Sequence, residues 1–422
     1  MKRILQSLIV VVLAIMFNAS SCDKKTDEMN KDVQEISTAE LRSAEDSIIQ
    51  HNRSFAFELF NNVLKAEQQG SGKSFMVSPI SLSMAMAMVW NGAEGETKTQ
   101  IQNTLGFEGV PDQAVNLYYK NLKDSVLSVD STTKIAIANS IWTNKNIKIK
   151  SDFLDKNNRY FNSTVESMDF GSPATAQRIN QWTADNTNNL IKDVMQSTNP
   201  MDLMYVLNAV YFKGTWTSKF DASQTKERPF TLENGQKTTV GMMEQEADFI
   251  YAEDDVMQAV MLPYGNRAFS MTVLLPKEGK KVADVAQHLQ DAETWTNIMS
   301  QSENYEVKLS LPKFKTEYNT ELNNVLQQMG ITQAFQSGSA DFSAMSDAEA
   351  FISAVNQFTY IETDEVGTEA AATTVIGIRT TSLQPQKPHT TFNANKPFVY
   401  VIQENYTGAI LFMGAVTDFS KQ

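Results

Sequence analysis

Apolar residues recur along this chain with helical spacing in some stretches and strand spacing in others. In "RSFAFELFNNVLKAE", Phe55, Leu59, Phe60 and Val63 lie on one helical face, and "QQGSGK" ends the predicted helix. The next stretch, "SFMVSPISLSMAMAMVWNGAEGETKTQIQNTLGF", predicts a short strand, a turn, an apolar helix and a second helix. Further helices are predicted at "ATAQRINQWTADNTNNLIKDVM" and "NTELNNVLQQMG".

Runs rich in β-branched and aromatic residues predict strands through the rest of the chain. They are "TKIAIANSIWTN", "LMYVLNAVYFKGTW", "FIYAEDDVMQAVMLPYG", "AFSMTVLLP", "YEVKLSLPKF", "AFISAVNQFTYIET" and "KPFVYVIQENYTGAILFMGAV". Helices and strands follow each other without regular alternation, which indicates an α+β domain with large antiparallel sheets. No internal repeat or low-complexity linker interrupts the sequence after residue 52, so residues 52–422 are predicted to form one domain.

The first 21 residues follow a different pattern. Two basic residues precede the apolar run "ILQSLIVVVLAIMF", and small residues follow it, as in a secretory signal. Cys22 comes next and resembles the lipidated cysteine of a bacterial lipoprotein, although Ala19 stands where leucine is usual. An ordinary signal with an incidental thiol is the alternative. Residues 22–51 are polar and predict a flexible tether. From the signal-like segment and Cys22 we expect export to the bacterial cell envelope and a lipid anchor, on the periplasmic side or the cell surface.

Charge and composition exclude several classes of function. Without the predicted signal segment, which contains Lys2 and Arg3, the chain has 34 of its 36 basic residues and all 49 acidic residues. The resulting net charge of −15 argues against nucleic acid as a partner. His51, His288 and His389 are far apart, and there is one cysteine, so the sequence predicts neither a catalytic triad nor a metal or cofactor site. A hydrolase therefore has little support, and we expect a protein that acts by binding or by changing shape rather than as an enzyme.

From about residue 52 to its end, the chain resembles the serpins. The resemblance rests on separate motifs in the family's order: "VSPISLSMAMAMVWNGAEGETKTQI", "VLNAVYFKGTWTSKFD", "LPYGNRAFSMTVLLP", "LSLPKFKTEYNTELNNVLQQMGITQAF", "DEVGTEAAATT" and "NKPFVYVIQENYTGAILFMGAV". It implies a monomer with a large central mixed β-sheet, further sheets, about nine helices and an exposed reactive loop at about 364–391. It also implies suicide inhibition, in which a protease cleaves the loop and is trapped as the loop inserts into the main sheet.

The segment "DEVGTEAAATTVIGIRTTS" at 364–382 resembles the serpin hinge and can be tested as a strand. Side chains of a strand alternate between its faces, so positions 368, 370, 372, 374, 376 and 378 share one face, and all are small or apolar. Both charges, Glu369 and Arg379, lie on the other face. This separation is what burial in a sheet requires. The predicted hinge consists of Glu365, Gly367, Thr368, Glu369, Ala370, Ala371 and Ala372.

The resemblance implies a cleavage site, whose position depends on whether residues are counted from the hinge or from the C-terminal side. The usual spacing from the hinge puts the reactive bond between Thr381 and Ser382, and counting back from the C-terminal side moves it toward Leu383. The bond between Arg379 and Thr380 is the rival. Thr381 would suit elastase-like proteases and Arg379 trypsin-like ones, with papain-like cysteine proteases as a further class. The alternative function is that of a non-inhibitory serpin acting as a binding module.

The resemblance also implies a polar cluster that governs opening of the main sheet. Ser78, Ser81 and Asn208 match this cluster, and Trp216 matches the tryptophan where the loop first enters. Gln357 stands where many serpins have histidine; its amide donates and accepts hydrogen bonds but does not titrate near neutrality, so no pH-dependent opening tied to that position is expected. No Lys and Arg cluster like the heparin sites of some serpins is found, so glycosaminoglycan activation is not expected.

Overall fold

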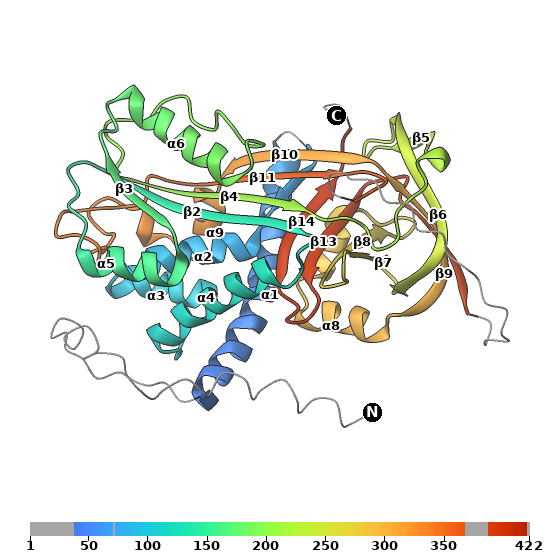
Figure 1. Ribbon diagram of the computed structural model, residues 1–422, viewed down its shortest axis with the longest axis horizontal. Coiled ribbons are helices and arrows are strands. Elements are labelled where there is room, and N and C mark those ends of the chain that lie inside the picture. The colour runs from blue at the N-terminus through green and yellow to red at the C-terminus, as the bar shows by residue number, and fades with distance from the viewer. Residues whose placement is uncertain (1–37, 71, 368–386, 420–422) are drawn as a thin grey trace, which may run out of the picture.

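A computed structural model describes residues 38–70, 72–367 and 387–419 of the chain (Figure 1). Nine α-helices lie within these residues, as the predicted fold implies. They are α1 Thr38–Gln69, α2 Pro79–Trp90, α3 Gly95–Leu105, α4 Asp112–Ser128, α5 Ser151–Lys156, α6 Pro173–Asn186, α7 Val282–His288, α8 Ala292–Gln301 and α9 Asn323–Gln328. Shorter helical turns occupy Asn157–Phe161, Ala222–Gln224 and Gln333–Phe335.

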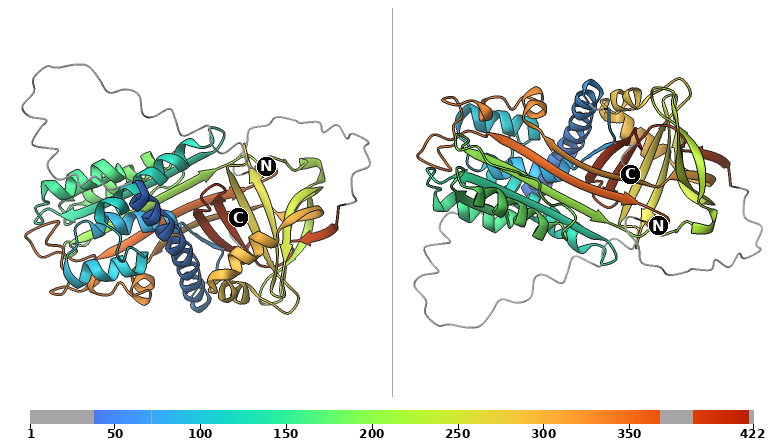
Figure 2. Two further views of the ribbon diagram at one scale, coloured as in Figure 1. Left: turned by 90° about the horizontal axis from the view of Figure 1, so that it is seen from below. Right: turned by 90° about the horizontal axis from the view of Figure 1, so that it is seen from above.

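A five-stranded sheet forms the central layer, in the order β10, β11, β4, β2, β3. Its strands are β2 Lys134–Asn144, β3 Thr164–Met168, β4 Met204–Lys213, β10 Phe314–Glu321 and β11 Ala354–Thr363. Helix α6 covers one face of this sheet, called the outer face here, and α2 to α5 lie on the inner face (Figure 1). The right-hand view of Figure 2 shows the molecule from above, with the strands of the central sheet running across the picture. The mixed sheet agrees with the predicted α+β class.

A nine-stranded sheet lies beside the first one along the long axis of the molecule (Figure 1). Its order is β1, β14, β13, β8, β7, β6, β9, β12, and β5 pairs with β6. The bounds are β1 Phe75–Val77, β5 Lys226–Thr231, β6 Lys237–Glu253, β7 Met257–Tyr264, β8 Phe269–Pro276, β9 Glu303–Pro312, β12 His389–Asn393, β13 Phe398–Glu404 and β14 Ile410–Val416. The strand predictions are thus confirmed as to type, with the longest apolar runs buried in the middle of this sheet.

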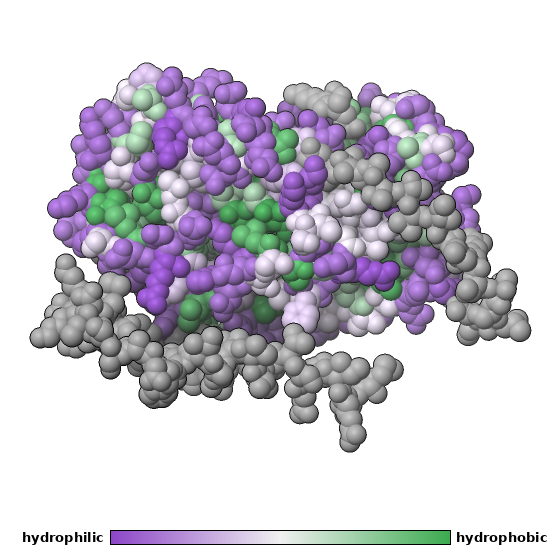
Figure 3. Space-filling model, in the orientation of Figure 1, coloured by the Kyte–Doolittle hydropathy of each residue, from purple (hydrophilic) through white to green (hydrophobic). Residues whose placement is uncertain are grey.

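Two apolar cores hold the molecule together. The larger one lies between the inner face of the central sheet, the nine-stranded sheet and helix α2, in which every residue is buried. The smaller core lies on the outer face, where Trp182 of α6 packs edge-on against Trp142 of β2, in a cluster that also includes Ile179 and aromatic residues of β4 and β11. On the face shown in Figure 3, polar residues cover most of the surface and apolar residues gather in small patches.

Helix α1 begins earlier than the sequence pattern suggested. It starts at Thr38, inside the segment 22–51 expected to be a tether, and Ile48 is fully buried in the larger core. Helix α1 therefore extends to the N-terminal side of residue 52. Sparse apolar residues such as Ile48 were enough to bury one helical face because the body of the protein supplies the other side of the contact, which periodicity within the segment does not reveal.

Two further differences concern helix ends. Helix α6 ends at Asn186 rather than running on to 195, because Asn188, Asn189 and Asp193 adopt positive φ. The stretch predicted to be helical from residue 319 first continues as β10 to Glu321, since β10 pairs with β11 to its end. The first helix thus ends through local backbone conformation, and in the second place strand pairing overrides local helix propensity.

Candidate functional site

The centre of the five-stranded sheet contains a parallel pair of strands. Strands β11 and β4 run parallel from Ala354, opposite Tyr205, to Tyr360, opposite Tyr211. Each of them is antiparallel to its other neighbour, β10 and β2 respectively. We call the boundary between β4 and β11 the seam. A strand running in the opposite direction would be antiparallel to both sides of the seam, and antiparallel pairing is slightly more stable per residue.

Gly367 already lies at one end of this seam, just beyond the C-terminal ends of β4 and β11. We call this the upper end. The Asp364 amide donates to the Gly367 carbonyl at 2.8 Å, so the chain reverses direction after β11. On its other side Gly367 forms an antiparallel bridge with Thr215, just beyond the end of β4. The predicted hinge residue is therefore placed between the two strands and runs antiparallel to both.

Glycine is required at this position. The φ angle of Gly367 is 146°, a conformation that residues with a Cβ rarely adopt. A Cβ there would also lie 2.2 Å from the Gly214 carbonyl oxygen and 2.7 Å from the Thr215 Cα. Only a residue without a side chain lets the chain enter between the strands this closely.

Backbone and indole hydrogen bonds close the upper end of the seam. The Trp216 amide donates to the Val366 carbonyl at 2.8 Å, and its indole Nε1 donates to the Asp364 carbonyl at 2.9 Å. The Trp216 ring stacks on Tyr264, with centroids 4.3 Å apart. The tryptophan expected where the loop enters thus contacts the hinge segment directly.

Glu365 ties the hinge to Lys313, between β9 and β10, and to Thr225, directly before β5. Its carboxylate lies 3.0 Å from the Lys313 ammonium and accepts a hydrogen bond of 2.8 Å from the Thr225 hydroxyl. Burial alone would raise the pKa of Glu365, but the bonds from Lys313, its own amide and Thr225 hold it below the ordinary value. Because the pKa is lowered in the folded state, this contact is present above the ordinary glutamate pKa and is lost as the pH falls through the lowered one.

A buried polar cluster bridges the seam near its middle. The Gln357 Nε2 on β11 donates to the Asn208 Oδ1 on β4 at 2.6 Å and to the Ser78 carbonyl at 3.0 Å, and the Gln357 Oε1 accepts from the Ser78 amide at 2.8 Å. The Asn208 amide nitrogen also contacts the Ser81 hydroxyl and the Asn139 Oδ1. All these side chains are buried, so opening the seam must break the Gln357–Asn208 bond and leave the Asn208 Oδ1 without its hydrogen-bond donor.

The structure brings together four of the residues expected in this cluster, Ser78, Ser81, Asn208 and Gln357. Asn139 was missed. Its signal was a polar residue in the middle of an apolar strand, and its position opposite Asn208 follows only from the β2–β4 register. Other predicted residues lie outside the described part of the chain: Cys22, Thr368, Glu369, Ala370, Ala371, Ala372, Arg379, Thr380, Thr381 and Ser382.

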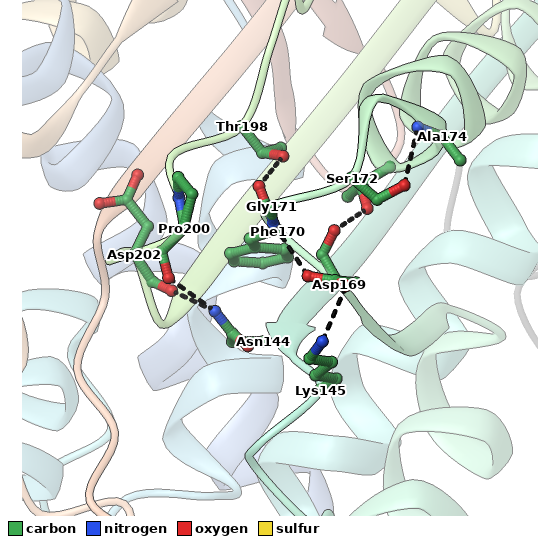
Figure 4. Close-up of polar contacts among 11 residues, drawn as sticks. Asn144, Lys145, Asp169, Phe170, Gly171, Ser172, Ala174, Thr198, Pro200 and Asp202 are labelled. Carbon is green, nitrogen blue, oxygen red and sulfur yellow. Dashed lines mark hydrogen bonds and ion pairs between the residues drawn. The ribbon is translucent and has the colours of Figure 1, made fainter.

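At the other end of the seam, where β4 and β11 begin, lies the segment that returns from α6 to β4; we call this the lower end. The side-chain Nδ2 of Asn144 on β2 donates to the carbonyls of Pro200 and Asp202, each at 3.1 Å (Figure 4). The Thr198 hydroxyl donates to the Phe170 carbonyl at 2.7 Å. The Phe170 ring in turn stacks on Tyr205 of β4. These contacts fasten the return segment to β2 and β4 on one side of the seam. The Leu203 amide donates across the seam to the Ser353 hydroxyl at 2.9 Å, so widening of the seam at this end must break that bond.

Chemistry of other kinds has little support in the described residues. They contain no group of three His, Cys, Asp or Glu side chains arranged to hold a metal ion. None of the described helices combines the length and apolar character that crossing a bilayer needs. The site is a mechanical one, built from a parallel seam, a glycine hinge and a polar bridge.

Comparison with known proteins identifies this arrangement. The family described as "Serpin (serine protease inhibitor)" matches residues 50–419. A serpin-like protein of Methanosarcina acetivorans is 33% identical over 99% of this chain and 98% of its own length. The leukocyte elastase inhibitor of Xenopus tropicalis is 35% identical over 85% of this chain and 96% of its own. The native structure of the thermophilic serpin tengpin superposes with a TM-score of 0.79 at 31% identity, covering 88% of this chain and 94% of tengpin. This chain therefore belongs to the serpin family.

Proposed function

We propose that this protein inhibits proteases by a cleavage and insertion mechanism in which residues after Gly367 enter the seam as a new strand. The observation that carries the proposal is a match of registers. Extending the antiparallel pairing from Gly367 puts Ala371 opposite Tyr360 on β11 and opposite Tyr211 on β4, which are already partners. It likewise puts Gly377 opposite Ala354 and Tyr205, again partners. The new strand would fit without any slip of β4 along β11.

The same register supports the face assignment drawn from the sequence. Thr368, Ala370, Ala372 and Thr374 would lie opposite the inner-face residues 363, 361, 359 and 357 of β11, which are at most 1% exposed. Glu369 would lie opposite Glu362, which is partly exposed on the outer face. The charge of the hinge therefore stays out of the core, and Thr374 arrives beside the polar bridge where its hydroxyl can replace a broken bond.

The chemistry of inhibition belongs to the target. A protease serine attacks the carbonyl carbon of the reactive residue, the peptide nitrogen of the following residue leaves with a proton, and an acyl-enzyme ester joins protease and loop. Insertion then turns one parallel pair of strands into two antiparallel pairs and carries the attached protease along the sheet. Distortion of the protease leaves the ester unhydrolysed, so the inhibitor is consumed in the reaction.

The reactive bond follows from the sequence and lies outside the described residues. We place it between Thr381 and Ser382, which favours elastase-like serine proteases, with Arg379 and trypsin-like enzymes as the rival. The relative named leukocyte elastase inhibitor supports the first assignment. Papain-like cysteine proteases are a further class of target, since a thiolate forms the equivalent thioester.

Incubation with elastase, trypsin and papain tests the proposed function. We expect a complex that survives SDS with at least one of them, and a released C-terminal fragment that begins at Ser382 by mass spectrometry. A fragment beginning at Thr380 would move the bond to Arg379. Cleavage with full recovery of protease activity would contradict inhibition and favour a non-inhibitory serpin.

We further propose that Cys22 carries a lipid and anchors the protein to the bacterial cell envelope. The basis is the signal-like segment before Cys22 and the polar stretch after it. Cells grown with a labelled fatty acid should incorporate the label into the wild-type protein and not into a Cys22→Ala variant. Equal labelling of both would refute the anchor and leave inhibition untouched.

A further inference from the structure

A buried carboxylate lies outside the seam and outside its polar cluster. Asp130 stands between α4 and β2 and is 4% exposed. Its Oδ1 accepts from the Thr132 amide at 2.9 Å and from the Thr132 hydroxyl at 2.7 Å. Its Oδ2 accepts from the Thr133 hydroxyl at 2.8 Å and from the Asn266 amide at 3.5 Å. Burial alone would raise the pKa of Asp130, but these hydrogen bonds hold it below the ordinary value, so the group is kept as a carboxylate.

Asp130 packs against the turn that joins β7 to β8, which we call the β7–β8 turn. Within this turn Gly265 has a φ angle of 45°, and a Cβ there would lie 2.3 Å from both the Asp130 Oδ2 and the Thr132 Oγ1. The Asn266 Nδ2 also donates to the Val129 carbonyl at 3.0 Å. The backbone of the turn therefore lies directly on the carboxylate, closer than any residue with a side chain at position 265 would allow.

The other side of the β7–β8 turn contacts the segment that bounds the upper end of the seam. The Gly265 amide donates to the Thr215 carbonyl at 2.7 Å, and Thr215 is the residue that forms the bridge with Gly367. Tyr264, directly before the turn, stacks on the Trp216 ring. Gly265 thus has the Asp130 carboxylate on one side and the edge of the seam on the other.

We infer that Asp130 is a positioning residue for the upper end of the seam, because it holds the β7–β8 turn where that turn keeps Thr215 and Trp216 bonded to the hinge segment. The bridge between Thr215 and Gly367 is a single pair outside the strands, so it depends on contacts that fix Thr215 from the other side. Its role in loop entry rests on the insertion proposed above. Entry begins with opening of this end, and Asp130 sets how readily it opens.

A purely local role for Asp130 does not account for the geometry. Its bonds with Thr132 and Thr133 would cap the start of β2 by themselves. The contact with Asn266 joins residues 136 positions apart. The close approach at Gly265 exists only because the turn lies on the carboxylate. Asp130 therefore joins two segments in addition to ending one.

Hydrogen exchange of the uncut protein tests this inference. Exchange is followed by mass spectrometry in short peptides that cover residues 214–217 and 264–267. In Asp130→Asn a side-chain NH₂ faces amide and hydroxyl donors, so we expect these peptides to exchange at least about tenfold faster than in wild type. Peptides from β13, inside the nine-stranded sheet, should keep their wild-type rates.

Asp254 provides a matched control. Its Oδ1 likewise accepts from two backbone amides, those of Val256 and Met257, in the turn between β6 and β7. Asp254→Asn therefore removes a similar carboxylate from a similar turn that does not contact the seam. It should leave exchange in residues 214–217 and 264–267 unchanged. An increase there equal to that of Asp130→Asn would overturn the inference.

Two further variants keep the inference testable if Asp130→Asn does not fold. Gly265→Ala adds a Cβ against the carboxylate and should speed exchange in the same peptides. Thr132→Val removes one donor and should speed it to a smaller extent. Faster exchange confined to residues next to the substitution, or equally fast throughout the protein, would overturn the inference. Absence of an SDS-resistant complex with the wild-type protein would defeat the proposed function instead, and the exchange rates would still decide whether Asp130 holds the upper end.

Discussion

Replacing Thr368 by arginine is expected to turn this protein from an inhibitor into a substrate of its target protease. The register from Gly367 places residue 368 on the inner face opposite Thr363, which is 1% exposed. Burying an unpaired guanidinium there costs about 3–5 kcal/mol, which slows insertion by roughly 100-fold or more. Hydrolysis of the acyl-enzyme then outruns trapping. The measurement is the fraction of serpin found in SDS-resistant complex against the fraction found cleaved.

The same charge one residue further along provides the control. Residue 369 would face outward opposite Glu362, so Glu369→Arg should leave most of the complex formation intact. Both variants introduce one arginine, at neighbouring positions on opposite faces, and Glu369→Arg makes the larger change in charge, so a stronger effect of Thr368→Arg is due to the face. If both lose inhibition equally, charge in the hinge matters but the strand register is wrong. If neither loses it, insertion is not how this protein acts.

Removing the Asn208 side chain is expected to destabilise the native form by about 3 kcal/mol. Asn208→Ala deletes the hydrogen bond from Gln357 across the seam. The Gln357 side-chain amide, the Ser81 hydroxyl and the Asn139 side chain then each lose their contact with Asn208. Thermal unfolding of the uncut protein should show a lower midpoint. The cut, inserted form should lose less, because insertion already breaks the Gln357–Asn208 bond.

A second buried amide pair serves as the control for Asn208. Asn91 and Asn116 exchange side-chain hydrogen bonds of 2.7 and 3.0 Å between α2 and α4, away from the seam. Asn116→Ala should therefore lower the stability of native and cut forms by the same amount. An equal loss in both forms for Asn208→Ala as well would show that the cluster supports the fold without restraining the seam.

Much of the site could be predicted because its residues must satisfy local rules. Gly367 was identified within a hinge motif, and the structure gives the reason in its φ angle and its contact with Gly214. Gln357 was expected to both donate and accept, and it does so on Ser78 and Asn208. Residues whose role depends on a partner far away in the chain escaped prediction: Asn139 and Lys313.

The boundaries of elements escaped for the same reason. Helix α1 starts at Thr38 because Ile48 finds a buried surface on the rest of the protein, and α6 stops at Asn186 although the pattern continues. Local propensity describes what a segment favours in isolation. Its ends are set by where contacts with other segments begin and stop.

Pattern and composition alone fixed the α+β class, the acidic character and the alternation of residues 368–378, since each depends only on residues close together in the chain. Folding decided that β4 and β11 run parallel, that Gly367 lies between their ends, and that Gln357 and Asn208 meet across the seam. The physical reason is sequence distance. Asn208 and Gln357 are 149 positions apart, and their meeting depends on the packing of both sheets around helix α2, which no local pattern encodes.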